Sequence, residues 1–156
     1  MISFEYLNKP DFSAFARQIF VILADNMTVI APTGNSREDD FALWFDAVSD
    51  GLQREERQII LIKDNETIVG FFQYYTNADT FMMEEIQFRP EYQGKGVFRK
   101  LYGFILKNIR NDLEYIEAYL LKKWKKRTNS IFQNNIKQKR HSQSYTVLKK
   151  HYLVLL

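Results

Sequence analysis

Two glycines stand two residues apart at positions 93–98, which read Gln-Gly-Lys-Gly-Val-Phe. Glycine lets the backbone turn tightly and point successive N–H groups outward. The segment lies between a β-rich run and an amphipathic run, so these groups would stand at a helix N-terminus, where an anion is favoured. Lys95, Arg99 and Lys100 add positive charge nearby. The pattern predicts an anion site that suits a diphosphate, although two such glycines alone also occur in purely structural turns.

Other signatures of catalysis are missing from the sequence. There is no Gly-x4-Gly-Lys-Ser/Thr, and the dinucleotide fingerprint would need a third glycine. Neither His-Glu-x-x-His nor Gly-x-Ser-x-Gly occurs. The absence of cysteine excludes disulfides, thiolate zinc sites and a cysteine nucleophile. We interpret His141 and His151, in the basic C-terminal quarter, as surface residues, and we expect no metal site.

The elements that would position the loop follow from apolar periodicity. Alternating or β-rich runs predict strands at 2–6, 58–63, 67–75, 80–89 and 113–121. Helical spacing predicts one helix after Pro10, a second that Asp39 or Asp40 caps and that ends near Gly51, and a third at 97–109. A strand, a glycine loop, a helix and a strand in succession require two parallel strands. We therefore expect one domain over residues 1–156, an α/β fold with a mixed sheet.

The string around the loop resembles the signature of the GNAT N-acetyltransferases. Residues 86–101 read Ile-Gln-Phe-Arg-Pro-Glu-Tyr-Gln-Gly-Lys-Gly-Val-Phe-Arg-Lys-Leu. The family signature has an aliphatic-x-Pro-Glu-Tyr segment, followed by Arg/Gln-x-x-Gly-x-Gly/Ala. The resemblance is strong over residues 80–110 and weaker over 58–121. It implies a GNAT-like fold, a central mixed β-sheet with helices on both faces.

The same resemblance implies acetyl-coenzyme A as the co-substrate, with no metal. Its pyrophosphate would lie on the loop, and its pantetheine arm along the strand that ends at Phe88. The family usually has Gly or Ala where this chain has Phe98, so the Phe98 ring would have to point away from the cofactor. The residues assigned to the cofactor in this way are Ile86, Gln87, Phe88, Gln93, Gly94, Lys95, Gly96, Val97, Phe98 and Arg99.

Acetyl transfer to an amine needs a base, donors for the developing oxyanion, and an acid for the leaving thiolate. Glu84 and Glu85 are the candidate bases. Adjacent strand residues face opposite sides, so only one of them would enter a given cleft. A solvated or ion-paired glutamate at the sheet edge is the alternative interpretation of each. The resemblance places the oxyanion donor on the strand backbone around residues 86–88.

The acid is the weakest part of the catalytic hypothesis. In the family a tyrosine hydroxyl faces the thiolate, but the best alignment places Phe132 there, and phenylalanine cannot donate a proton. The acid would then come from Tyr119, from Tyr145 or from water, or catalysis would be lost. A thiol pKa of about 8.5 makes thiolate a tolerable leaving group, so lack of an acid would slow the reaction without stopping it.

The family commonly builds its acceptor site from the early helices and the third and fourth strands. The aromatic residues assigned to the substrate on this basis are Trp44, Tyr74 and Tyr75. Core packing is the alternative for aromatic residues at helical spacing, Trp44 among them. If they line the pocket, the acceptor carries an apolar or aromatic portion.

The charge distribution leaves further functions open. The net charge is +3, yet residues 122–156 hold ten Lys or Arg and no acidic residue. Three hypotheses follow: an N-acetyltransferase that acts on a small-molecule or protein amine, a catalytically weak or inactive acyl-coenzyme A sensor, and a nucleic-acid-associated protein that uses the basic tail. The sequence predicts no signal peptide or membrane span. A cytoplasmic location is expected, and a homodimer is left open.

Overall fold

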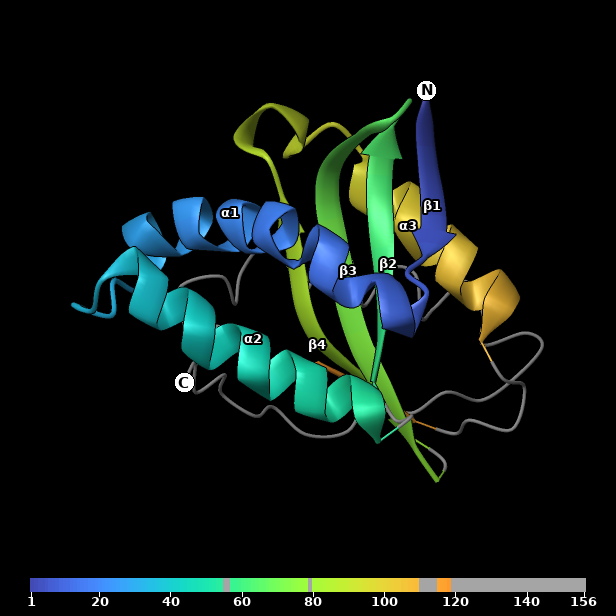
Figure 1. The fold of residues 1–156 in the computed structure, drawn as a ribbon. Helices are drawn as coiled ribbons and strands as arrows, with labels where there is room; N and C mark the ends of the chain where they lie inside the picture. Colours follow the sequence, from blue (N-terminus) through green and yellow to red (C-terminus); the bar gives the residue numbers. More distant parts are fainter. Residues whose placement is uncertain (55–56, 79, 110–114, 119–156) are drawn as a thin grey trace.

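A computed structural model describes residues 1–54, 57–78, 80–109 and 115–118 of the chain (Figure 1). The elements in chain order are β1 (Ile2–Tyr6), the 3-10 helix η1 (Lys9–Asp11), α1 (Phe12–Ile30), α2 (Arg37–Gln53), β2 (Arg57–Asp64), β3 (Thr67–Asn77), β4 (Thr80–Phe88), the 3-10 helix η2 (Pro90–Tyr92), α3 (Val97–Asn108) and β5 (Tyr115–Ala118).

The described strands form one sheet in the order β1-β2-β3-β4-β5. The first four pair antiparallel, and β4 pairs parallel with β5 from Thr80 opposite Tyr115 to Met83 opposite Ala118. The glycine loop and α3 make the connection between these two parallel strands. This confirms the mixed sheet and the crossover that the glycine loop predicted.

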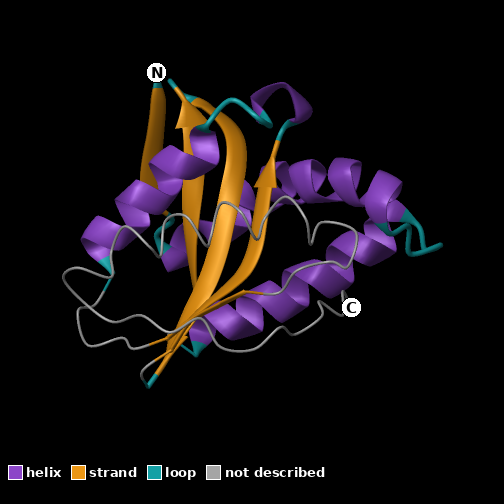
Figure 2. Cartoon of the chain, turned by 180° about the vertical axis from the view of Figure 1, so that it is seen from behind, coloured by secondary structure: helices purple, strands orange, loops and turns teal. Residues whose placement is uncertain are grey.

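Helices cover both faces of the sheet, as expected. In Figure 1, α1 and α2 cross one face, and Figure 2 shows α3 on the other. Strand side chains alternate between the two faces, so each face has its own apolar cluster. Ile59, Leu61 and Phe71 pack with α1 and α2, whereas Ile60, Ile62 and Phe72 pack with α3. We refer below to the α1/α2 face and the α3 face of the sheet.

The second helix begins earlier and ends later than the sequence predicted. Ser36, not Asp39 or Asp40, caps it, because the Ser36 hydroxyl accepts a hydrogen bond from the Asp39 N–H at 3.1 Å. Asp40 instead accepts a hydrogen bond from the Thr33 hydroxyl in the preceding loop. At the other end the helix continues through Gly51 to bury Leu52.

The first helix is the most apolar one described. By length and composition alone, Lys9–Ile30 would be long enough and apolar enough to cross a membrane. The inner face of α1 is nevertheless packed on the sheet. Its buried residues are Phe12, Ala16, Ile19, Phe20, Ile22 and Leu23. A core helix has this same composition, so the segment is weak support for a membrane span.

Candidate functional site

The loop between β4 and α3 has the backbone that its glycines predicted. Gly94 and Gly96 have φ of 75° and 77°, in the left-handed region that favours glycine. A Cβ added at either residue would have no heavy atom within 4 Å. Backbone conformation, not lack of room, therefore requires the two glycines, and the space beside both of them is open.

The backbone N–H groups of this loop differ in whether they donate a hydrogen bond within the protein. The Gln93 N–H donates to the Pro90 carbonyl at 3.2 Å. In the part of the chain that the structure describes, no hydrogen bond involves the N–H of Gly94, Lys95, Gly96 or Val97. These four groups lie at the N-terminal end of α3, where the helix dipole favours negative charge. The amides without a described partner thus begin at Gly94, not at Gln93, and an anion site at this loop stays a prediction.

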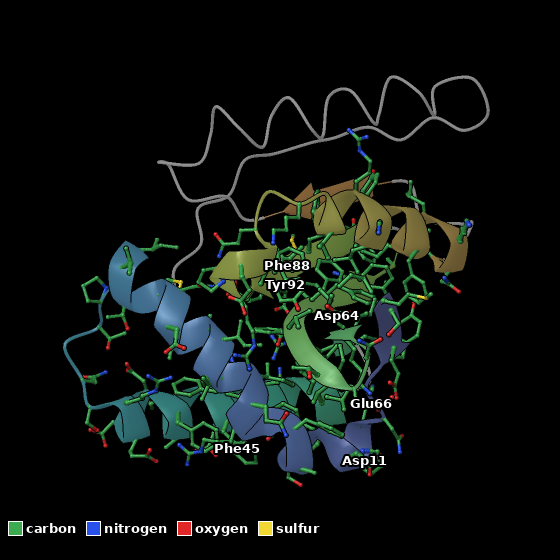
Figure 3. All side chains as sticks on the ribbon, turned by 90° about the horizontal axis from the view of Figure 1, so that it is seen from above. Asp11, Phe45, Asp64, Glu66, Phe88 and Tyr92 are labelled. Atoms are coloured by element: carbon green, nitrogen blue, oxygen red, sulfur yellow. The ribbon has the colours of Figure 1, made fainter. Side chains whose placement is uncertain are left out.

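Three contacts hold the loop on the β2–β3 hairpin. The Tyr92 hydroxyl donates to Asp64 Oδ2 at 3.0 Å (Figure 3). Arg89 donates from its backbone to the Val69 carbonyl at 2.8 Å and from Nε to the Ile68 carbonyl at 3.1 Å. The loop therefore stands in a fixed place at the end of β4.

Phe98 occupies the position where the family signature has a small residue. Its ring is half-buried, packs against the apolar cluster of the α3 face, and lies 6.2 Å from the Tyr102 ring between centroids. The Phe98 side chain thus packs into the core and leaves the exposed loop residues Gly94, Lys95 and Gly96 uncovered.

Glu84 and Glu85 lie on the same face of the sheet, contrary to our expectation. Gln73 of β3 pairs with Glu85 and Tyr74 pairs with Met83, so Glu84 is an extra residue in β4. Such a β-bulge interrupts the alternation of side chains. The Glu84 carboxylate bonds Gln73 Nε2 at 3.1 Å, and Glu85 lies directly opposite Gln73, on the α1/α2 face.

Glu84 is held by an ion pair. Arg57 of β2 donates from Nε to Glu84 Oε2 at 2.6 Å and from Nη2 to Oε1 at 2.7 Å. Arg57 also donates from Nη1 to the Ala47 carbonyl of α2 at 2.9 Å. Both carboxylate oxygens of Glu84 are therefore occupied, which fits the ion-paired interpretation better than that of a base.

Glu85 is a buried carboxyl group with a raised pKa. Burial of its carboxyl group, and to a smaller extent the charge of Glu84, raise the pKa of Glu85 to about 7. Hydrogen bonds from Gln87 Nε2, at 2.7 Å, and from the Ile86 N–H act in the opposite direction. A carboxylate with a pKa near neutrality can both take and release a proton at working pH.

The raised pKa of Glu85 predicts a stability cost that depends on pH. The unfolded value is 4.5 and the folded value about 7, so between these pH values the folded chain binds more protons, and stability falls as pH rises. The Glu85→Gln variant is expected to match wild type below pH 4.5 and to be more stable at pH 8, by on the order of 3 kcal/mol. Urea unfolding at both pH values measures this, and equal stability at pH 8 would contradict the prediction.

The aromatic residues assigned to the substrate do not meet on one surface. Trp44 packs in the cluster between α1 and α2, 5.5 Å from the Phe20 ring between centroids. Tyr74 stacks on Phe81 at 4.6 Å on the α3 face, where burial raises the pKa of its hydroxyl. Tyr75, the next residue in β3, lies on the opposite face from Tyr74. Tyr74 pairs with Met83, the residue next to Glu84, whereas Tyr75 pairs with Met82. The three aromatic residues therefore do not line one common surface.

Several residues of the catalytic hypothesis lie outside the described part of the chain. These are Tyr119, Tyr145 and Phe132, together with the basic tail and both histidines. Among the residues that are described, no group of three or more His, Cys, Asp or Glu could hold a metal.

Sequence reasoning missed two polar residues that contact the candidate site. Arg57 holds Glu84, and Asn26 of α1 donates from Nδ2 to Gln87 Oε1 at 2.7 Å. Asn26 stands three residues after buried Leu23, on the inward stripe of an apolar helix. A polar residue in such a stripe needs a buried partner, and that was the available signal.

Comparison with known proteins agrees with this geometry. The family model of the acetyltransferase (GNAT) family matches residues 16–131. This chain therefore belongs to the GNAT acetyltransferase family. No curated protein sequence matches it significantly.

Solved structures resemble this fold at low sequence identity. The PaiA N-acetyltransferase of Thermoplasma acidophilum, solved in complex with coenzyme A, is 13% identical, with a TM-score of 0.63 over 86% of this chain and 88% of that one. A GNAT-family acetyltransferase of Staphylococcus aureus Mu50 is 13% identical, with a TM-score of 0.65 over 87% and 84%. A ribosomal-protein-alanine N-acetyltransferase of Brucella melitensis is 12% identical, with a TM-score of 0.57 over 99% of each chain. At this identity the likeness shows the fold alone.

Proposed function

We propose that this chain, as a single domain of residues 1–156, is an N-acetyltransferase. It would transfer acetyl from acetyl-coenzyme A to a primary amine of a small molecule or protein, by direct attack in a ternary complex. The observation that carries the proposal is the row of unused amides at Gly94, Lys95, Gly96 and Val97 at the start of α3. Membership of the GNAT family supports the use of an acyl-coenzyme A.

The cofactor would lie along the end of β4 and on the loop. Its pyrophosphate would accept hydrogen bonds from the four loop amides, with Lys95 and Arg99 as the neighbouring cations. The described part of β5 pairs with β4 from Thr80 to Met83. The pantetheine arm would lie further along β4, beside Ile86, Gln87 and Phe88.

Glu85 is the proposed base, and Glu84 is not. Glu85 would take the proton from the acceptor ammonium, directly or through a water. The free amine would then form the new C–N bond as the C–S bond breaks, and the thiolate would take a proton from solvent, Tyr119 or Tyr145. A backbone N–H group of Gln87 or Phe88 would stabilise the oxyanion, since the Ile86 N–H already donates to Glu85. What supports Glu85 is its carboxyl group with a pKa near neutrality, next to the proposed cofactor strand.

The surroundings of Glu85 favour a cationic acceptor. Glu84 and Glu85 share the α1/α2 face. Between them Gln73 is buried, and its Oε1 has no hydrogen-bond partner within the described residues. Arg57 occupies the Glu84 carboxylate, so the ionised Glu85 carboxylate is the acceptor that would match the N–H groups of an alkylammonium.

A pair of glycine variants tests the cofactor site. Gly96→Ala is expected to weaken coenzyme A binding by about 10- to 100-fold, because its Cβ would stand beside amides that donate to a charged group. Gly34→Ala is the matched control, since Gly34 also has positive φ, at 82°, and open space around it. Both variants place a Cβ on a residue with positive φ and so introduce similar backbone strain. Both should therefore lose similar stability. Isothermal titration with coenzyme A measures the affinity, and an equal effect of the two variants would count against the loop as the binding site.

Activity itself is tested by thiol release with acetyl-coenzyme A and a panel of amines. Turnover above the rate without amine is expected for at least one alkylamine. Tight binding of acetyl-coenzyme A without turnover on any amine or peptide would instead indicate an acyl-coenzyme A sensor.

A further inference from the structure

Asn26 of α1 joins the glycine loop to Glu85 through a continuous set of hydrogen bonds. Its Nδ2 donates to Gln87 Oε1 at 2.7 Å and to the Phe88 carbonyl at 2.9 Å. Its Oδ1 accepts from Gln93 Nε2 at 3.4 Å, and the same Nε2 donates to the Phe88 carbonyl at 3.1 Å. Gln87 Nε2 in turn donates to Glu85 Oε1 at 2.7 Å. One helix side chain thus contacts both the loop and the partner of the proposed base.

The direction of each hydrogen bond in this set is fixed. A backbone carbonyl can only accept, so the Phe88 carbonyl requires the nitrogen end of the Asn26 amide. That nitrogen then donates to the oxygen of the Gln87 amide, which leaves the NH2 end of Gln87 facing Glu85. A Gln87 amide turned the other way would offer its oxygen to Glu85 and would favour the protonated acid. The orientation of Asn26 therefore decides whether the Gln87 amide stabilises the ionised or the protonated form of Glu85.

We propose that Asn26 is a positioning residue that fixes the Gln87 amide as a donor to Glu85 and ties Gln93 of the loop to the end of β4. The inference rests on the proposed function, in which Glu85 is the base and the loop binds the cofactor. The new element is that Asn26 couples the glycine loop to the proposed base, Glu85.

The charges that face Glu85 are few in the described part of the chain. On β4 the neighbour is Glu84, whose charge Arg57 of β2 balances. On β3 it is Gln73, and on α1 the neighbours of Gln87 are Asn26 and Met27, all uncharged. A change at Asn26 therefore acts on Glu85 through Gln87, without displacing an ion pair.

Two variants of Asn26 separate its two contacts. Asn26→Leu removes both contacts. The pKa that governs the rise of kcat/KM with pH, called the acid limb below, is then expected to increase by about one pH unit, and KM for acetyl-coenzyme A by about fivefold. Asn26→Asp keeps an acceptor for Gln93 but draws the Gln87 NH2 away from Glu85 and adds a negative charge. The pKa of the acid limb should increase more in this variant than in Asn26→Leu, while KM for acetyl-coenzyme A changes less. The control is Asp25→Asn, in the same helix turn, where an exposed carboxylate pairs with Arg37; its acid limb and KM should match wild type.

A second readout does not depend on turnover. Carbon-13 NMR of the labelled carboxyl groups follows the titration of Glu85, whose signal is identified by its loss in Glu85→Gln. The Glu85 midpoint should rise in both Asn26 variants and stay unchanged in Asp25→Asn. An unchanged midpoint in both Asn26 variants would overturn the inference. Absence of turnover in wild type would overturn the proposed function instead, and the NMR titration would still decide the role of Asn26.

Discussion

Replacing Glu85 by glutamine is expected to lower kcat for acetyl transfer by about 10²- to 10⁴-fold, the usual contribution of a positioned general base. Glutamine has nearly the same shape and can still accept the hydrogen bond from Gln87 Nε2. It cannot take a proton from the acceptor ammonium. The loss should therefore fall on the chemical step and not on the binding of coenzyme A.

The pH profile distinguishes a base from a residue that only supports the site. Burial raises the pKa of Glu85 to about 7, so wild-type kcat/KM should rise with pH and level off above this value. The residual activity of Glu85→Gln should lack this limb. Stopped-flow thiol detection between about pH 5.5 and 9, with a saturating amine, provides the measurement.

Glu84→Gln is the informative comparison for this experiment. Arg57 occupies both oxygens of Glu84, so that variant should keep the acid limb even if the fold is weakened. If Glu84→Gln lost the rise of kcat/KM with pH and Glu85→Gln retained it, Glu84 and not Glu85 would be the base.

The glycine loop and the crossover could be predicted from the sequence, because both are encoded locally. Positive φ at Gly94 and Gly96 is a property of single residues, and a helix that follows such a loop has a fixed handedness of connection. The separation of Tyr74 from Tyr75 was equally local, since adjacent strand residues face opposite sides. The alternation of strand side chains therefore places the two tyrosines on different faces of the sheet.

The arrangement around Glu85 could not be predicted in the same way. The bulge at Glu84 depends on how β4 pairs with β3, which no single segment specifies. The Asn26–Gln87 hydrogen bond joins residues 61 positions apart, and the Arg57–Glu84 pair joins residues 27 apart. Tertiary packing decides both contacts, so the sequence offered only the clue of polar residues in apolar surroundings.

The ion pair between Arg57 and Glu84 lies at the bulge of β4. Arg57 connects β2, the bulge and α2, and the side chains of Arg57 and Glu84 are only 22% and 15% exposed. A Cβ on Gly51 of α2 would come within 1.9 Å of Arg57 Nη1, so the helix packs closely on the guanidinium. Arg57→Met is expected to cost about 3–5 kcal/mol, because it leaves the Glu84 carboxylate buried without its counterion.

A double variant shows whether the cost comes from the unpaired charge. Adding Glu84→Met to Arg57→Met removes that charge and fills similar volume, so most of the lost stability should return. Arg37→Met is the control, since Arg37 and Asp25 form a pair that is 50% and 55% exposed and should contribute less than about 1 kcal/mol. Urea unfolding at pH 7 gives all four values. A similar loss for Arg57→Met and Arg37→Met would mean that the ion pair does not hold the bulge, and the orientation of Glu85 beside it would then depend on the Gln87 and Asn26 contacts alone.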